Sequence, residues 1–241
     1  MSAPPTTVLR ASPEEAAAIR QAVRTVDVAT LGPGRVRAGP EHVAGLTALL
    51  ADDRVSGPIY DLPRPITEAS VARWVAESQA LTEAGEALLI LTLDADGAVA
   101  GYSRISVWPD RSSAELAGAI RADLQNRGQG GEGMARSFDW IFEVLGVRLM
   151  CLTAALDNVR SQKGIDAAGF RRMGEREAVR PDGTTRRSVY WEMTRDEWRR
   201  RGRRKPPLTS RFGRTPRPGP NSAVMPDGRG VDAAASERTR S

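Results

Sequence analysis

Apolar residues recur at helical spacing in several stretches of the chain, and polar capping residues mark where those stretches begin. Ser12 followed by Pro13 is typical of a helix start, because the serine caps free N–H groups and proline fits the first turn. Thr67 has the same capping position after a loop at 57–65 that contains three prolines. The pattern predicts helices over residues 13–26, 40–51, 67–84, 134–145 and 158–168.

Strand-length apolar runs occupy much of the remaining sequence. The pattern predicts strands over residues 35–38, 86–93, 98–108, 114–121, 147–156, from 169 onward, and 188–194. Asp94 to Gly97 has the composition of a hairpin turn. The run at 147–156 is nearly all apolar, so we expect both of its faces to be buried. After the first helix the predicted order is β-α-α-β-β-β-α-β-α-β-β, which is an α/β fold.

Composition narrows the kinds of site that the chain can hold. The 241 residues are 40% hydrophobic and 27% charged, which suits one globular domain with extensions. Cys151 is the single cysteine and His42 the single histidine, which excludes a disulfide framework and any metal site that needs two imidazoles. We therefore predict no metal site. We interpret Cys151 as a buried small hydrophobic residue and His42 as a surface residue.

The basic charge is concentrated at the C-terminus. The net charge is +5, but residues 199–241 alone carry +9 and the rest of the chain −4. This segment is rich in Arg, Pro and Gly and poor in large apolar residues, so it is predicted to be a disordered tail that is either a solubilising extension or a weak contact for a polyanion. We therefore divide the chain into an extension with one helix (1–30), a globular domain (31–198) and the tail (199–241). No apolar run is long enough to cross a membrane and no signal peptide is visible, so we expect a cytoplasmic location.

The segment between the strand at 114–121 and the helix at 134–145 is dense in glycine. Such a loop lets the backbone approach an anion, and the free N–H groups at the start of the helix point at it. Gly128 to Gly133 matches the dinucleotide fingerprint G-x-G-x-x-G, and Asp157 follows at the end of the next strand. However, Gly128 lies eight residues after Ile120, whereas the first glycine of that fingerprint ends the strand.

Gln125 to Gly130 also matches [Q/R]-x-x-G-x-[G/A], and this match suits its context better. The stretch 114–130 resembles the acyl-CoA motif of the GNAT (Gcn5-related N-acetyltransferase) superfamily, in particular its bacterial protein-lysine-acetyltransferase-like and Rim-type members. Asn158 to Ser161 with Gly169-Phe170 resembles a second family segment at its usual spacing. The resemblance covers about residues 35–198. It implies the GNAT fold, a mixed twisted sheet of about six to seven strands with helices on both faces.

The resemblance also implies roles for individual residues. Backbone groups near Ala119 and Ile120 would pair with the pantetheine arm of acetyl-CoA, the expected co-substrate, and Asn158 would contact the same arm. The motif residues Gln125 and Asn126, followed by the backbone N–H groups of Arg127, Gly128, Gln129, Gly130 and Gly131, would bind the pyrophosphate. Glu115 stands where relatives have their proposed catalytic base, and a strand-end carboxylate in a salt bridge is its structural alternative.

Two departures from the family pattern leave a second hypothesis open. Many members have a tyrosine, the acid toward the CoA thiolate, where this chain has Ile165, and Gly131 and Gly133 replace larger residues. The first hypothesis is an N-acetyltransferase that moves an acetyl group to an amine of a protein or a small molecule by direct attack. The second is a weakly active or inactive CoA-binding module that the tail tethers to a polyanion.

Several side chains are predicted near the acceptor. Asp52, Asp53 and Asp61 flank the loop that would wall the acceptor site, where they either attract a cationic acceptor or are simply solvated. Tyr60, Trp74 and Trp108 lie nearby, and packing is their expected role.

Overall fold

The structure is a computed structural model that describes residues 4–59, 61–125, 130–179 and 183–204. Seven strands form one sheet: β1 (Arg35–Arg37), β2 (Ala87–Leu93), β3 (Val99–Trp108), β4 (Ser113–Ile120), β5 (Leu149–Ala155), β6 (Arg171–Val179) and β7 (Thr185–Thr194). The helices are α1 (Pro13–Thr25), α2 (Val43–Ala51), α3 (Asp53–Ser56), α4 (Glu68–Ala84), α5 (Gly130–Glu143), α6 (Val159–Ala168) and α7 (Arg195–Arg204). Short 3-10 segments lie at Val28–Leu31, Pro40–His42, Pro109–Arg111 and Ala122–Leu124.

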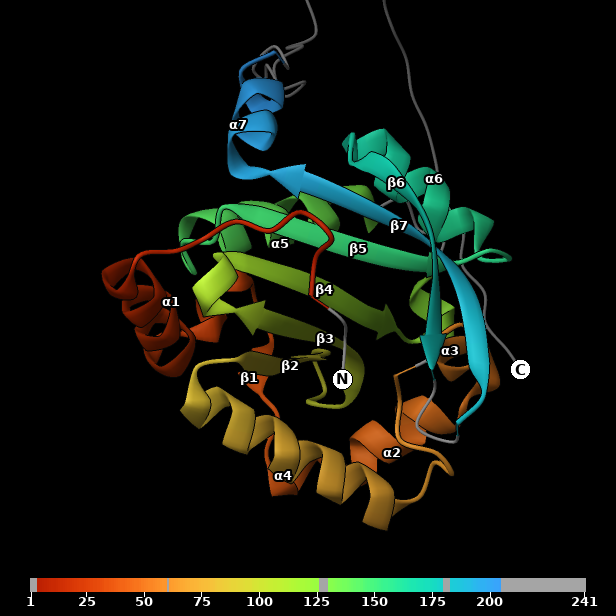
Figure 1. The fold of residues 1–241 in the computed structure, drawn as a ribbon. Helices are drawn as coiled ribbons and strands as arrows, with labels where there is room; N and C mark the ends of the chain where they lie inside the picture. The colour runs from red at the N-terminus through yellow and green to blue at the C-terminus, as the bar shows by residue number, and fades with distance from the viewer. Residues whose placement is uncertain (1–3, 60, 126–129, 180–182, 205–241) are drawn as a thin grey trace, which may run out of the picture. The chain divides into compact units, whose positions relative to one another are not determined.

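The sheet is mixed, as the sequence predicts. Its spatial order is β1-β2-β3-β4-β5-β7-β6, and of the pairings that the structure describes only β4–β5 is parallel. The hairpin β6–β7 places the last strand between β5 and β6 (Figure 1). The element order of the domain confirms the predicted α/β fold.

Each face of the sheet has its own apolar core. One core joins the sheet to α1, α5 and α6, and its largest fully buried members include Phe138, Phe142 and Trp191. The other core joins β1–β3 to α2, α3 and α4 through residues such as Leu46 and Leu50. β5 is buried almost throughout, because helices cover one face and polar groups and the N-terminal segment cover the other. The helices thus lie on both faces, as predicted.

α1 is an integral part of this unit. Ser12 caps it by accepting from the N–H of Glu15 at 3.2 Å, and the inward side chains Ile19 and Val23 are almost fully buried. Glu15 also accepts from Ser112 and from Arg148, both at 2.7 Å, which ties the helix to the turn before β4 and to the strand after α5. The segment predicted as an extension therefore contributes to the main core.

The structure differs from the sequence predictions at three places. α5 begins at Gly130, not at residue 134, so the glycines from 130 onward belong to the first turn of the helix. α3 was missed, because four residues give no periodic signal.

α7 extends to Arg204, so the predicted tail boundary at 199 falls inside a helix. The many arginines of this segment favoured disorder in the sequence analysis. In the structure Trp198 packs edge-on against Phe138 at 5.6 Å, and Arg199 pairs with Glu143 at 2.6 Å. The remainder of the predicted tail, residues 205–241, lies outside the described residues.

We predict that Ile19→Ala lowers the free energy of unfolding by about 2–5 kcal/mol, because it leaves a cavity in the core under β2 and β3. Urea denaturation of the full chain measures this change. Gln21→Ala, an exposed change on the same helix, serves as the control and should cost little. Equal stability of the two variants would mean that α1 does not fold with the domain.

Candidate functional site

β4 and β5 separate halfway along their length. They pair in parallel at three positions, of which the last joins Glu115 to Cys151. Beyond it β4 continues to Ile120 on β3, and β5 continues to Ala155 on β7. Both strands therefore keep their outer partners while the sheet opens between them.

The open edge of β4 has backbone groups that the sheet does not use. The N–H of Arg121 donates to the carbonyl of Ala100 at 2.8 Å. This bond shows which residues of β4 turn their backbone groups toward β3 and which turn them away. Because such a ladder alternates, the N–H and C=O of Ala119 face β3, while those of Gly118 and Ile120 face the opening beyond the last β4–β5 pair. The predicted pantetheine contacts at Ala119 and Ile120 stay a prediction, and of these two residues only Ile120 turns backbone groups toward the opening.

Two motif residues hold the far end of the opening in place. Gln125 donates from Nε2 to the Ile120 carbonyl at 3.0 Å and accepts from Arg160 of α6 at 2.7 Å. Asn158 caps α6, since its Oδ1 accepts from the N–H of Ser161 at 3.1 Å. Both side chains therefore have structural roles at the positions where the sequence predicts contacts with a ligand.

The predicted anion cradle lies at the start of α5. Asn126, Arg127, Gly128 and Gln129 lie outside the described residues, whereas Gly130 and Gly131 form the first turn of the helix. The first N–H groups of this 14-residue helix have no partner within it, and its dipole favours an anion there. The helix start thus suits a phosphate group.

Glu115 lies at the point where the two strands separate. Its side chain is only 4% exposed, and Oε1 accepts a hydrogen bond from Thr153 of β5 at 3.0 Å. Register places Ser106 of β3 on one side of it and Cys151 on the other, all on one face of the sheet. Burial raises the pKa of the Cys151 thiol well above its usual value, and the negative charge of Glu115 adds to this. Cys151 therefore stays a neutral thiol, in line with its predicted role as a buried small side chain.

A strap formed by residues 4–10 crosses the same face over β5 and β7 (Figure 1). The N–H of Thr6 donates to the hydroxyl of Tyr190 at 3.0 Å, and the N–H of Thr7 donates to Glu192 at 3.0 Å. The hydroxyls of Thr7 and Tyr190 also donate to Glu192, and the guanidinium of Arg176 stacks on the Tyr190 ring at 3.6 Å. Glu115, Cys151 and Glu192 lie in register on three adjacent strands and form one polar row. The strap covers the Glu192 end of this row.

The loop before α4 faces the opening from the other side. Asp61 lies 3.7 Å from Arg104 of β3, and both side chains are about nine-tenths buried. Asp52 instead caps α3 and pairs with Arg54 at 2.7 Å, and Asp53 is an exposed residue of α3. Of the three predicted carboxylates, only Asp61 is therefore shown to engage a side chain of β3.

The other predicted side chains divide between packing and the cavity. Trp74 is buried and packs edge-on against Tyr102 at 5.5 Å, as expected, whereas Trp108 lines a cavity described below. His42 is half-buried, not fully on the surface, and its Nδ1 accepts from the N–H of Gly39 at 3.1 Å. Tyr60 lies outside the described residues.

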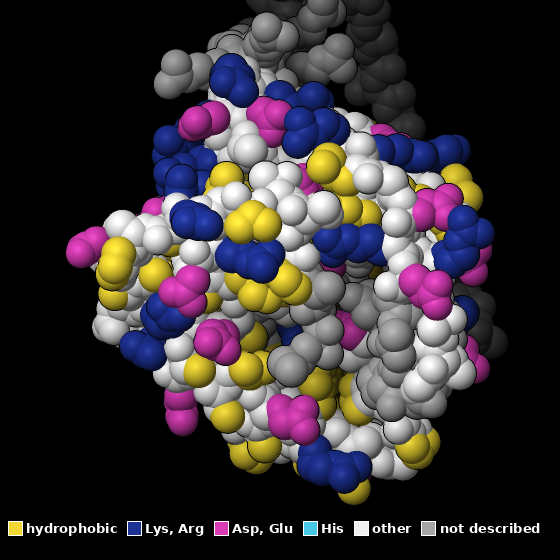
Figure 2. Space-filling model, in the orientation of Figure 1, with side chains coloured by type: hydrophobic (Ala, Val, Ile, Leu, Met, Phe, Trp, Pro, Cys, Tyr) yellow, Lys and Arg dark blue, Asp and Glu magenta, His cyan; other side chains and the backbone are white. Residues whose placement is uncertain are grey.

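Sequence reasoning missed Arg104, Thr153 and the strap. Their partners lie far away in the chain, and no local sequence pattern predicts these contacts. Among the described residues, no helix has the length and apolar character to cross a membrane, and no group of His, Cys, Asp or Glu side chains could hold a metal ion. Basic and acidic side chains are interspersed over the visible face, with Lys and Arg more frequent toward α7 (Figure 2).

Comparison with protein families matches residues 36–171 to the acetyltransferase (GNAT) domain. Comparison with curated proteins gives no significant match. The matched residues run from the second residue of β1 through β5 and end at the first residue of β6.

Solved structures with the same fold include three acetyltransferases. Ribosomal-protein-S5-alanine acetyltransferase from Vibrio fischeri has a TM-score of 0.58 at 14% identity, over 68% of this chain and 93% of the other. RimJ from Mycobacterium smegmatis in complex with CoA-disulfide has a TM-score of 0.57 at 17% identity, over 68% and 82%. A variant of spermidine N-acetyltransferase SpeG from Vibrio cholerae has a TM-score of 0.56 at 16% identity, over 70% and 98%. These similarities establish the fold.

We predict that the strap is bound less tightly in acid because of Glu192. Burial raises the pKa of this carboxyl, but the hydrogen bonds from Thr7 and Tyr190 outweigh burial and hold the pKa below its ordinary value of 4.5. A carboxyl with a lowered folded pKa stabilises the fold fully above its ordinary pKa, and this contribution disappears as the pH falls through the folded value.

Glu192→Gln should therefore destabilise the protein by roughly 1–3 kcal/mol at pH 7 and flatten the loss of stability between about pH 5 and pH 3. Urea denaturation across this range measures both effects. Glu177→Gln, an exposed change on the neighbouring strand β6, provides the matched control. An unchanged acid limb in Glu192→Gln would show that the carboxylate does not hold the strap.

Proposed function

Because this chain belongs to the GNAT acetyltransferase family, we propose that it is an N-acetyltransferase that uses acetyl-CoA as donor and a primary amine as acceptor. The separation of β4 from β5 beyond Glu115 is the observation that carries the proposal. It offers an extended ligand a row of unused backbone groups, with a helix start at one end and a buried carboxylate at the other. For such an enzyme we expect a cytoplasmic location.

The described residues fit the chemical parts of acetyl-CoA. The amide groups of the pantetheine arm would pair with the open edge of β4 at Gly118 and Ile120, as an added strand would. The diphosphate would lie at the start of α5, where N–H groups and the helix dipole favour negative charge. In this arrangement the thioester would lie toward Glu115.

Glu115 would serve as the general base. The amine nitrogen attacks the thioester carbonyl carbon, the C–S bond then breaks, and the acetyl group remains on the nitrogen as an amide. Glu115 accepts the proton that the amine releases, and a proton ends on the CoA thiolate, so that the products are the amide and CoA. The hydrogen bond from Thr153 holds one oxygen of the carboxylate in place.

A weakly active CoA-binding module is the second candidate, and Ile165 favours it. This residue stands where many family members have the acid toward the thiolate, and its side chain is 5% exposed within the core. No proton donor stands at that position. A thiolate leaves without an acid, so the rate of transfer decides between the two candidates.

We predict that acetyl-CoA raises the melting temperature of the full chain, since a ligand that binds only the folded state stabilises it. NAD should give no shift, because the glycine loop is interpreted here as a cradle for CoA. A side chain at the helix start would take the space of the phosphates, so Gly130→Val should abolish the shift. Differential scanning fluorimetry measures all three.

Gly133→Ala is the matched control for this prediction. A Cβ at Gly133 meets no other atom within 4 Å, and alanine favours a helix more than glycine does. This variant should keep the full response to acetyl-CoA. A shift with NAD and none with acetyl-CoA would instead support the dinucleotide interpretation.

We predict that Glu115→Gln lowers the rate of acetyl transfer by roughly two to four orders of magnitude, the usual worth of general base catalysis. The change keeps the size of the side chain and its acceptor for Thr153, so the affinity for acetyl-CoA should stay the same. The pH–rate profile should also lose its acidic limb. CoA release with a panel of amines measures the rate.

Glu77→Gln on α4 exchanges an exposed carboxylate for the same amide and should leave the rate unchanged. Near-full activity of Glu115→Gln with an accepted amine would assign the proton transfer to another group or to bulk water. Glu115 would then be a structural residue at the end of the β4–β5 pairing.

A further inference from the structure

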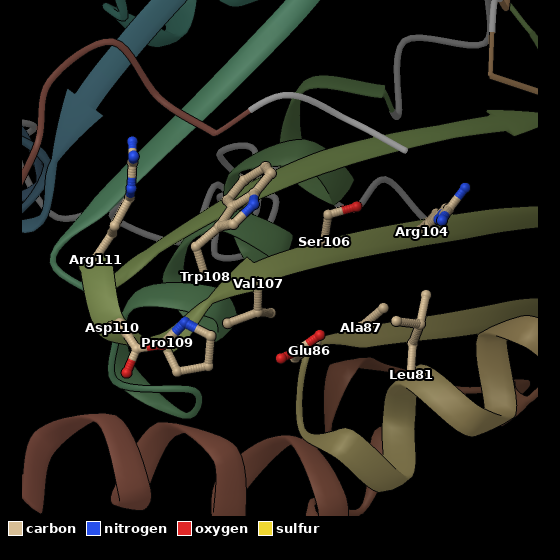
Figure 3. A pocket seen from close by; sticks show the side chains of 10 residues that line it. All are labelled: Leu81, Glu86, Ala87, Arg104, Ser106, Val107, Trp108, Pro109, Asp110 and Arg111. Atoms are coloured by element: carbon tan, nitrogen blue, oxygen red, sulfur yellow. The ribbon is translucent and has the colours of Figure 1, made fainter. Parts of the chain in front are cut away.

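A cavity of about 220 Å³ lies on the face of the sheet that bears Glu115. Figure 3 shows Arg104, Ser106 and Trp108 of β3 on one side of it, with Leu81 and Ala87 opposite. Pockets for drug-sized ligands span roughly 300–1,000 Å³, so this cavity suits a smaller molecule.

Register places this cavity next to Glu115. Ser106 lies directly opposite Glu115 in the β3–β4 ladder, so the two side chains are neighbours on one face. Arg104 lies opposite Ala117 and is thus the diagonal neighbour of Glu115, at a backbone separation of ~7–8 Å. Glu115 does not line the cavity itself, but it lies on the next strand, beside the lining residue Ser106.

Arg104 is a buried cation without the hydrogen bonds that such a group normally makes. It is 8% exposed, its nearest charged partner is Asp61 at 3.7 Å, and its Nε has no partner within the described part of the chain. Buried charges are ordinarily both paired and hydrogen-bonded, because leaving water is costly. The Nε–H of this guanidinium thus remains available to a ligand. The planar guanidinium matches the two oxygens of a carboxylate.

The other charges of the cavity suit a ligand that carries both signs. Arg111 is the second cation among the described lining residues, and Glu86 and Asp110 contribute carboxylates at the rim. Asp110 is paired with Arg20 at 2.7 Å, and Glu86 lies just before β2, on the other side of β3 from Glu115. The cavity therefore offers cationic donors for an anion, and Glu115 on the neighbouring strand is the carboxylate for an amine.

Building on the proposed function, we propose that this cavity is the acceptor site and that the acceptor is a small amino acid, whose carboxylate binds Arg104 and Ser106. In an α-amino acid one carbon separates the amine from the carboxylate. Binding of the carboxylate at β3 therefore brings the amine to the Glu115 side. A protein N-terminus or a lysine side chain lacks a carboxylate at this distance and would leave the Nε of Arg104 without an acceptor.

Isothermal titration calorimetry of the full chain in the presence of CoA tests the site without turnover. The probes are L-amino acids and the matching amino acid amides, which keep the amine and lose the negative charge. We expect an amino acid to bind, and its amide to bind about 10- to 100-fold more weakly, the usual worth of a charge-assisted hydrogen bond. Equal binding of acid and amide would overturn the proposal, as would no binding of any amino acid up to about 10 mM.

The double variant Asp61→Asn/Arg104→Gln removes both buried charges together, so that neither is left alone in the fold. It should weaken amino acid binding by about 10- to 100-fold and leave the binding of the amide unchanged. Glu143→Gln/Arg199→Gln removes the exposed pair between α5 and α7 in the same way and is the matched control. Equal affinities of both double variants and the unaltered chain for the amino acid would also overturn the proposal.

The response to acetyl-CoA in the melting assay separates this proposal from the general function. If acetyl-CoA stabilises the protein and peptides are acetylated while amino acids do not bind, the acceptor proposal fails and the transferase remains. If amino acids bind through Arg104 but acetyl-CoA gives no shift, the cavity binds its ligand and the transferase proposal fails.

Discussion

The parallel pairing of β4 with β5 ends after three positions, and the site depends on this interruption. A sheet normally satisfies every backbone N–H and C=O, and leaving such groups buried without partners is costly. Here β3 holds β4 along its full length and β7 holds β5, so the opening cannot close by sliding one strand. The unused groups of β4 therefore form a fixed binding edge, which water or an extended ligand must satisfy.

Two cores keep this opening in place from opposite sides. The core under α5 and α6 fixes the far end, where Gln125 connects the last carbonyl of β4 to Arg160 of α6. The core under α2 and α4 places the loop with Asp61 over Arg104 of β3. Packed elements therefore hold the described part of the opening on both sides.

Much of the fold was predictable, because it is encoded locally. Apolar spacing predicts most of the helices and strands, and three predicted inner positions of α5, Phe138, Ile141 and Phe142, are all buried, as is Leu145 just after the helix. Motif spacing predicts the family, but it does not separate binding roles from structural ones: Asn158 caps α6, and Gln125 holds the end of β4. The contacts that complete the site were not predictable in this way. Thr153 lies 38 residues from Glu115, and Thr7 lies 185 residues from Glu192.

Three polar residues in register, Glu115, Cys151 and Glu192, lie on one face of the sheet on adjacent strands. The two carboxylates of this row have different hydrogen-bond partners because of their positions. Glu192 receives the N–H and hydroxyl of Thr7 and the hydroxyl of Tyr190, which hold its pKa below the ordinary value and keep it ionised under the strap. Its acceptor capacity is thus used within the protein. Glu115 lies at the other end of the row, where the strands part and Thr153 orients it from β5. The strap therefore covers the Glu192 end of the row, whereas the Glu115 end lies where β4 and β5 separate.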